Sequence, residues 1–101
     1  MQYTEILDGE IYKIKVYEKF TFSDHLEFKK FFDVFDKNTF KNMEIDASSL
    51  EFVDSAALGL FLLLRDRAIQ AQVKLTIIRP QGQVQKMFKI SRFYELFNIV
   101  E

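Results

Sequence analysis

The sequence predicts one α/β domain, residues 1–101, built on a mixed sheet of four or five strands with crossover helices. Three observations support this fold class. Segments with strand-like and helix-like hydrophobic periods alternate along the chain. The pair Asp8-Gly9 separates the first two strand-like segments, as expected for a β-hairpin. The 101 residues, 49% hydrophobic and 29% charged, suit a single core.

Short apolar runs bounded by polar or turn residues predict the strands, which cover residues 2–7, 10–17, 43–47, 73–78 and 96–100. In the second strand, Tyr12, Ile14 and Val16 alternate with lysines, which predicts one buried face. Residues 48–52 and 91–95 are predicted to form loops or turns. Because helices separate the strands from the second strand onward, the sheet should be largely parallel after its opening hairpin.

Three helices are predicted, near residues 24–36, 55–71 and 82–90. The first has phenylalanines at helical spacing behind the N-cap candidates Ser23 and Asp24. The residues expected to be mostly buried are Phe28, Phe32, Phe35, Leu58, Leu62, Leu75 and Ile77. Twelve phenylalanines are many for a chain of this length, so we expect a few to be partly exposed at a partner surface.

Composition excludes several classes of site. The chain has no Cys, which excludes disulfides, thiol catalysis and cysteine-ligated metal or iron–sulfur centres. The single histidine, His25, excludes a multi-histidine metal site, and the sequence has no glycine-rich phosphate loop. A lone histidine near a helix start is usually a surface or capping residue rather than a general base. The prediction is a protein that is not an enzyme, with no metal site and no cofactor.

Charge and hydropathy limit the partners. With 14 Lys and Arg against 15 Asp and Glu, the chain lacks the basic excess typical of nucleic-acid modules. The N-terminal residues show no signal-peptide pattern. The longest apolar run, residues 56–64, is far shorter than the roughly 20 residues that cross a membrane. We therefore expect a cytoplasmic protein with no nucleic-acid partner and no membrane span.

The segment of residues 52–65 does not fit an ordinary core helix. Asp54 and Ser55 precede two alanines and a dense apolar run. Helix capping by Asp54 or Ser55 explains the start, and core packing explains about half of the leucines. The apolar residues nevertheless surround the first half of the helix, and a sheet covers only one side of it. Either another helix or a partner must cover the rest.

This segment resembles the signature of the STAS domain family, the anti-sigma-factor antagonists. Members show Asp-Ser-Ser/Thr-Gly-Leu-Gly at the start of their second helix. The matching residues are Asp54, Ser55, Leu58 and Gly59, whereas Ala56 replaces the second hydroxyl residue and Ala57 the first glycine. The order of elements also fits, so the resemblance spans nearly the whole chain and implies a STAS-like sheet and helices.

A second motif resembles one branch of the family, found with sigma-regulatory switches that control motility and biofilm. The motif is the Phe-Thr-Phe-Ser run at residues 20–23, with His25 and Phe28 behind it. Two positions depart from the branch pattern, since Glu18 stands in place of a glycine and Thr21 in place of an aspartate.

The resemblance implies a phosphorylation-controlled binding switch. Ser55 would be the phosphoacceptor of an anti-sigma factor that is also a serine kinase with a histidine-kinase-like ATPase fold. The unphosphorylated form would bind that partner and free a sigma factor, and a metal-dependent serine phosphatase would reset the switch.

The partner interface is expected at three places that the crossover topology brings to one rim. They are the Ser55 end of the second helix, the loop of residues 20–24 and the loop of residues 48–53. The interface residues expected there are Asp54, Ala56, Ala57, Leu58, Gly59, Phe22, Ser23 and Asp24. A charge at Leu58 or Leu60 should abolish partner binding if that side chain is exposed.

Two alternatives remain open. A non-phosphorylated STAS scaffold, or a subunit of a lipid-transport or signalling complex, would use Ser55 only as an N-cap. A small enzyme or ligand-binding domain would use the same helix N-terminus to hold an anion.

Overall fold

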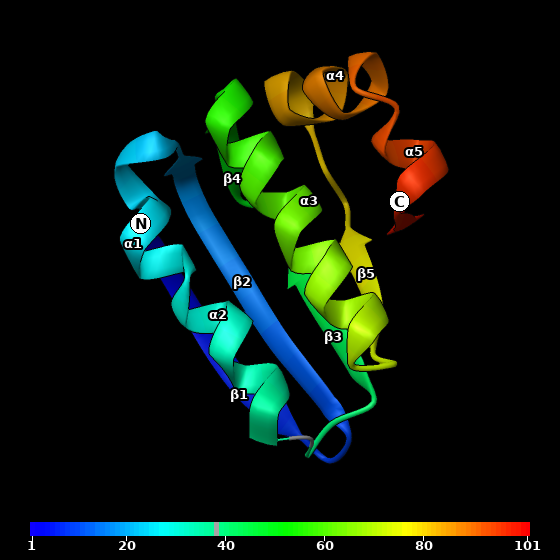
Figure 1. The fold of residues 1–101 in the computed structure, drawn as a ribbon. Helices are drawn as coiled ribbons and strands as arrows, with labels where there is room; N and C mark the ends of the chain where they lie inside the picture. Colours follow the sequence, from blue (N-terminus) through cyan, green and yellow to red (C-terminus); the bar gives the residue numbers. More distant parts are fainter. Residues whose placement is uncertain (38) are drawn as a thin grey trace.

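The computed structural model describes residues 1–37 and 39–101, and its helices pack on one side of a mixed sheet (Figure 1). The strands are β1 (Gln2–Asp8), β2 (Ile11–Phe20), β3 (Asn42–Asp46), β4 (Leu50–Val53), β5 (Lys74–Ile78) and β6 (Asn98–Val100). The helices are α1 (His25–Phe28), α2 (Lys30–Asp33), α3 (Ser55–Gln70), α4 (Gly82–Ile90) and α5 (Phe93–Leu96). Two 3-10 helices, η1 (Phe22–Asp24) and η2 (Val34–Lys37), adjoin α1 and α2.

The opening hairpin forms where the Asp8-Gly9 pair predicts it. Gly9 has a φ of 61°, a left-handed conformation that glycine adopts without steric cost. β1 runs antiparallel to β2, from Gln2 opposite Tyr17 to Asp8 opposite Ile11. The strand order is β1-β2-β3-β5-β6, and the pairs beyond the hairpin are parallel. The predicted mixed, largely parallel sheet is confirmed.

The sheet has six strands, one more than the upper limit of the prediction. The additional strand is β4, in a segment predicted to be a loop. The far end of β2 pairs with β4, from Glu18 opposite Leu50 to Phe20 opposite Val53, and the register shifts between Glu18 and Lys19. Only the two end residues of β4 are buried, so this short strand has no period-two pattern by which to recognise it.

The first predicted helix is divided into short pieces. α1 and α2 contain four residues each, and the backbone N–H of Phe32 donates to the carbonyl of Lys29, three residues back. The phenylalanines of this segment are nevertheless buried, as their helical spacing predicts.

The C-terminal segment also differs from the prediction, because helix α5 replaces a turn and β6 begins only at Asn98. Phe93 and Phe97 are both buried, and their ring centroids lie 4.7 Å apart. One helical turn brings this i, i+4 pair together in the core.

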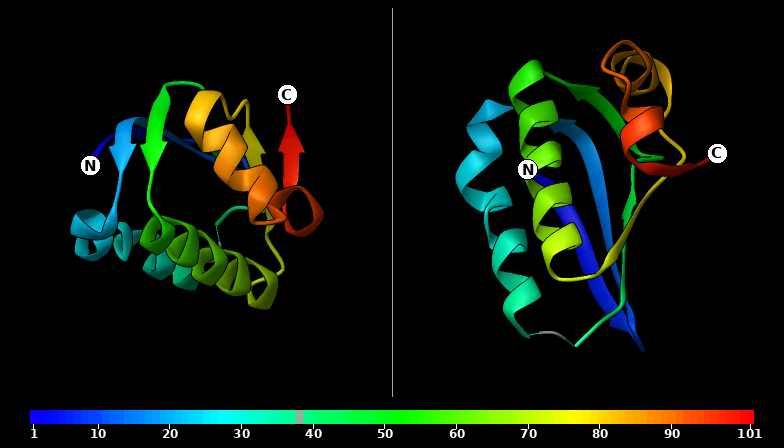
Figure 2. Two further views of the ribbon diagram at one scale, coloured as in Figure 1. Left: turned by 90° about the horizontal axis from the view of Figure 1, so that it is seen from above. Right: turned by 45° about the vertical axis from the view of Figure 1, so that its right-hand side comes forward.

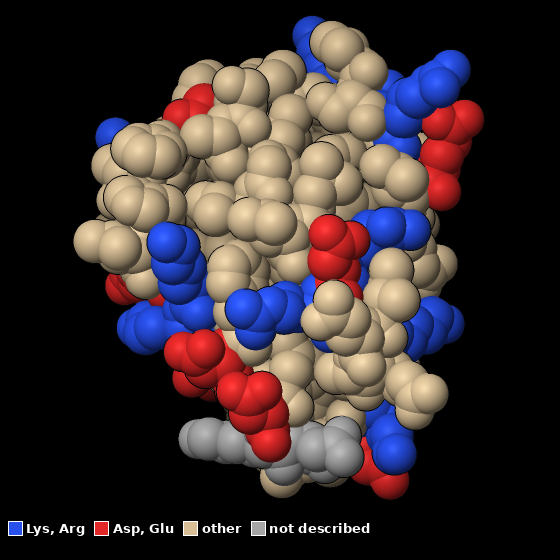
Figure 3. Space-filling model, viewed as in Figure 1, with Lys and Arg blue, Asp and Glu red and all other residues tan. Residues whose placement is uncertain are grey.

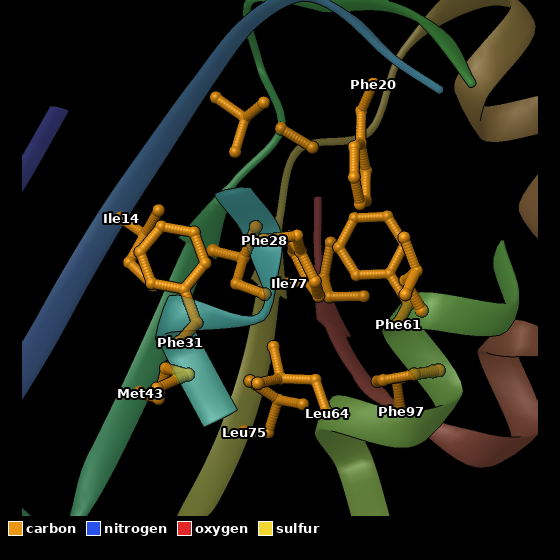
Figure 4. Close-up of a cluster of buried hydrophobic side chains, with 14 of the residues drawn as sticks. Ile14, Phe20, Phe28, Phe31, Met43, Phe61, Leu64, Leu75, Ile77 and Phe97 are labelled. Atoms are coloured by element: carbon orange, nitrogen blue, oxygen red, sulfur yellow. The ribbon is translucent and has the colours of Figure 1, made fainter. Parts of the chain in front are cut away.

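Aromatic rings fill the core between the sheet and α3 (Figure 4). The ring of Phe61 packs edge to face against Phe20, Phe28 and Phe88, at centroid distances of 5.2, 5.8 and 5.8 Å. Such pairs contribute roughly 0.5–1.5 kcal/mol each beyond their burial. The prediction of buried residues was wrong for Leu62, which is 37% exposed because it lies on the side of α3 that faces away from the sheet.

The helices cover one face of the sheet. α1, α2 and α3 lie on that face, and α4 and α5 close the sheet at one end, beside β4 and β6 (Figure 2). The opposite face carries no helix in the described part of the chain. None of the helices in residues 1–37 and 39–101 is long and apolar enough to cross a membrane.

Candidate functional site

The site is organised by one carboxylate at the start of α3. Asp54 is the N-cap, and its Oδ1 accepts a hydrogen bond of 2.8 Å from the backbone N–H of Ala57. Its Oδ2 accepts a second bond, of 3.0 Å, from the backbone N–H of Phe22. Asp54 therefore joins the helix to the loop that follows β2. The cap, which the sequence left open between Asp54 and Ser55, belongs to Asp54.

Ser55 is the first residue of α3, and its side chain is exposed. The first N–H groups of a helix have no partner within the helix, and the helix dipole is positive at this end. A negatively charged group on the Ser55 hydroxyl would therefore stand where the backbone favours an anion.

α3 has two distinct sides near this site. Ser55, Gly59 and Leu62 follow one another at helical spacing on the exposed side, with Leu63 beside them. Ala57 and Leu58, two residues of the predicted interface, are buried and serve packing. Leu58 and Leu60 are only 7% and 8% exposed, so a charge at either position would not test partner binding. The exposed residues Leu62 and Leu63 are the suitable positions for that test.

The loop after β2 presents an ordered aromatic pair. The rings of Phe22 and His25 stack with centroids 4.5 Å apart and an interplanar angle of 10°. Nδ1 of His25 lies 2.8 Å from the carbonyl oxygen of Phe22. Nδ1 donates a hydrogen bond to this oxygen when the imidazole carries a proton on Nδ1. Phe22 is exposed, as the phenylalanine count led us to expect of a few such residues.

Asp24 fixes the other end of this loop. Its Oδ2 accepts a bond of 2.9 Å from the backbone N–H of Thr21, and its Oδ1 lies 2.8 Å from the Met1 ammonium. Burial acts to raise the pKa of Asp24. The Met1 ammonium and the Thr21 N–H outweigh it and hold this pKa below its usual value. Asp24 therefore acts mainly as a charged anchor for the loop, and Ser23 remains exposed beside it.

An exposed apolar surface adjoins the site. We call it the helix-face patch, and it consists of Phe22, Leu26, Leu62 and Leu63. α1 and α3, which carry most of it, are in contact. Figure 3 shows that the upper half of this side of the molecule is almost free of charged residues, which gather along the lower half and the margins. Sequence reasoning missed Leu26, Leu62 and Leu63, since helical spacing alone did not show which leucines face solvent.

A glutamine that sequence reasoning missed holds the residue before Asp54. The Gln83 side chain accepts a bond of 3.0 Å from the N–H of Val53 and donates one of 2.9 Å to its carbonyl oxygen. α4 is thereby fixed to the residue that precedes Asp54. No signal in the sequence marks Gln83, because its partners are backbone atoms 30 residues away. Among the described residues, no cluster of His, Asp and Glu could hold a metal ion.

Comparisons with known proteins identify the family. Residues 8–101 match the sequence profile of the STAS domain. The chain belongs to the STAS domain family. A STAS-domain containing protein of Pseudomonas aeruginosa (strain UCBPP-PA14) is 31% identical over 94 residues, which are 91% of this chain and 90% of that protein.

Solved structures share the fold of this STAS domain. The protein tm1081 from Thermotoga maritima superposes with a TM-score of 0.87 at 15% identity, covering 98% of this chain and 86% of that one. The anti-sigma factor antagonist SpoIIAA in its unphosphorylated form gives 0.80 at 14% identity, covering 99% and 88%. The phosphorylated form of SpoIIAA, a Bacillus cell fate determinant, gives 0.76 at 14% identity, covering 99% and 92%. At these identities the comparison establishes the STAS fold.

Proposed function

We propose that this STAS domain is an anti-sigma-factor antagonist whose partner binding is switched off by phosphorylation of Ser55. The observation that carries the proposal is the position of Ser55 on α3. It is exposed at the first helical residue, it heads the exposed stripe that continues through Gly59 and Leu62, and Asp54 has taken the capping role. Ser55 is thus free to serve a task other than stabilising the helix.

A phosphate at this position would change the surface without unfolding the domain. The helix N-terminus tolerates the added charge of about −1.5 to −2. The same charge would stand at the end of an uncharged surface, beside the carboxylate of Asp54. Burying it against a partner would require its desolvation, and a loss of ~3 kcal/mol would already weaken binding by a factor of about a hundred.

The proposed partners follow from this chemistry. The domain supplies only an acceptor hydroxyl, so a serine kinase must provide the phosphate and a phosphatase must remove it. We assign these roles to an anti-sigma factor with a histidine-kinase-like ATPase fold and to a metal-dependent serine phosphatase, which places the switch in the cytoplasm. The alternative, a scaffold or transport-complex subunit in which Ser55 is only a cap, is weakened by the capping role of Asp54.

Co-purification from the native cell with intact-mass measurement would report the partner and the phosphate together. Calorimetry with that partner then tests the switch. Ser55→Ala should bind as the wild type does, while Ser55→Asp should bind at least about tenfold more weakly. Ser91→Asp, in the turn between α4 and α5, is the matched control and should leave binding unchanged. Wild-type affinity in the Ser55→Asp variant would overturn the proposal.

A further inference from the structure

The face of the sheet opposite the helices is open to solvent. Along the central strands the buried side chains, such as Ile14 and Ile45, point toward the helices. Their neighbours in sequence point the other way, onto a face that no described helix covers (Figure 2). We call it the open face. It has a shallow hollow of about 360 Å³, whose lining includes Ile6, Lys13, Lys15, Glu44, Asp46 and Ile78.

The charges of the open face are ordered by the strand register. Lys13 of β2 lies opposite Glu44 of β3, and Lys15 lies opposite Asp46. One central strand therefore contributes two lysines and its neighbour two carboxylates. Among the described residues, none of these lysines forms an ion pair with either carboxylate. The nearest anion to Lys13 is instead Asp8, at 3.4 Å.

Apolar side chains flank these charges. Ile6 of β1 is the cross-strand neighbour of Lys13, and Ile78 of β5 is the neighbour of Asp46. Ile6 is 62% exposed. The open face thus has two charged rows at its centre and one isoleucine in the strand on either side, next to Thr4 of β1 and Thr76 of β5.

We propose that the open face binds a second copy of the same chain. A twofold axis that runs parallel to the strands, between β2 and β3, places each β2 over the partner's β3. Lys13 then faces the partner's Glu44 and Lys15 the partner's Asp46, and symmetry doubles these contacts to four ion pairs. The strands of the two sheets stay nearly aligned, as in face-to-face sheet packing. An axis across the strands would instead place lysine over lysine.

The proposed dimer should be weak and independent of the Ser55 site. The face is largely polar, and polar interfaces of small area give transient complexes. Exposed ion pairs are also screened by salt. Ser55 and the helix-face patch lie on the other side of the sheet, so both copies would keep a free partner site. If the protein proves not to dimerise, the proposed switch at Ser55 is therefore unaffected. If phosphorylation of Ser55 proves not to control partner binding, the proposed dimer is likewise unaffected.

Sedimentation equilibrium over a concentration series, at low and high salt, measures this self-association. The wild type should form dimers that dissociate as salt is raised. Lys13→Glu with Lys15→Glu should weaken dimerisation at least about tenfold, and so should Glu44→Lys with Asp46→Lys, because each variant opposes like charges. The double variant Lys86→Glu with Lys89→Glu, on α4, is the control and should dimerise like the wild type.

Two further samples test whether the lysines of each copy contact the carboxylates of the other. Equal amounts of the two reversed variants should form a heterodimer, and the variant with all four charges exchanged should dimerise again. A wild type that stays monomeric at about 1 mM, or reversed variants that do not restore association, would overturn the proposal. If a reversed variant fails to fold, as judged by circular dichroism, Lys13→Gln with Lys15→Gln replaces it. Unchanged dimerisation in that variant would equally overturn the proposal.

Discussion

At the scale of single residues, adjacent side chains at the start of α3 have different tasks. Asp54 caps the helix and holds the backbone of Phe22, whereas Ser55 faces solvent. Both residue types are good N-caps, and which of them caps depends on where the first helical turn begins. In this fold Asp54 also accepts a hydrogen bond from Phe22, 32 residues away in the sequence, which a local pattern cannot show.

This division of tasks predicts unequal losses of stability. Asp54→Ala should lower the free energy of unfolding by about 2 kcal/mol, because it removes a helix cap and a second hydrogen bond of about 1 kcal/mol each. Ser55→Ala should change it by less than about 0.5 kcal/mol. Urea denaturation measures both, with Asp66→Ala, an exposed acid of the same helix, as the control. An equal loss in the Ser55 variant would contradict the cap assignment.

A strained residue marks the point where β2 changes partner. Glu18 has a φ of 62°, a left-handed conformation that disfavours residues with a Cβ atom. Its position adjoins the register shift in the pairing of β2 with β4, and its N–H donates to the carbonyl of Ser49 at 3.0 Å. The family branch that this chain resembles has a glycine at this position. Glutamate in place of that glycine therefore strains the backbone at residue 18.

Relief of that strain should be measurable. Glu18→Gly should raise the free energy of unfolding by about 0.5–1 kcal/mol, since the gain from the left-handed conformation exceeds the entropy that glycine adds to the unfolded chain. Lys19→Gly, at the next residue of the same strand, should lower it by a similar amount. Thermal and urea unfolding compare the two. A loss of stability in both variants would show that Glu18 is not strained.

At the scale of elements, α3 is both a core helix and a surface helix. Its inner side buries Phe61 and Leu64, and its outer side exposes Gly59, Leu62 and Leu63. A charge on the outer side should oppose partner binding without disturbing the core. The expected outcome differs for Leu58 and Leu60, where a charge would be buried and would destabilise the fold.

We therefore expect Leu62→Glu and Leu63→Glu to weaken binding of the co-purified partner at least about tenfold, because each variant must desolvate a carboxylate at the interface. The melting temperature should change by only a few degrees. Ile69→Glu, at an exposed leucine-sized position near the other end of α3, is the matched control and should bind normally. If both leucine variants retain wild-type affinity, the partner surface lies elsewhere.

At the scale of the whole molecule, the sheet separates two surfaces. The helix side carries Ser55 and the helix-face patch, and the open face carries the ordered charges of β2 and β3. A dimer through the open face would present two partner sites facing outward, so each could be phosphorylated and bound on its own.

The local pattern of the sequence determined the hairpin, the alternation of the other strands with the main helical segments, and the phenylalanine-rich core, but it did not reveal β4 or α5. Those features depend on the period of apolar residues and on turn chemistry, which neighbouring residues fix. The resemblance to the STAS domain rests on a contiguous stretch, residues 54–59, so it can be recognised from the sequence without the structure.

Only the tertiary structure decided which residues meet across long separations. β4 became a strand because the far end of β2 offered it unpaired backbone groups, and Gln83 found the backbone of Val53 through the position of α4. The exposure of Leu62, which the sequence predicts to be buried, depends on which side of α3 faces the sheet. Such contacts are set by packing between elements, and no local period in the chain encodes them.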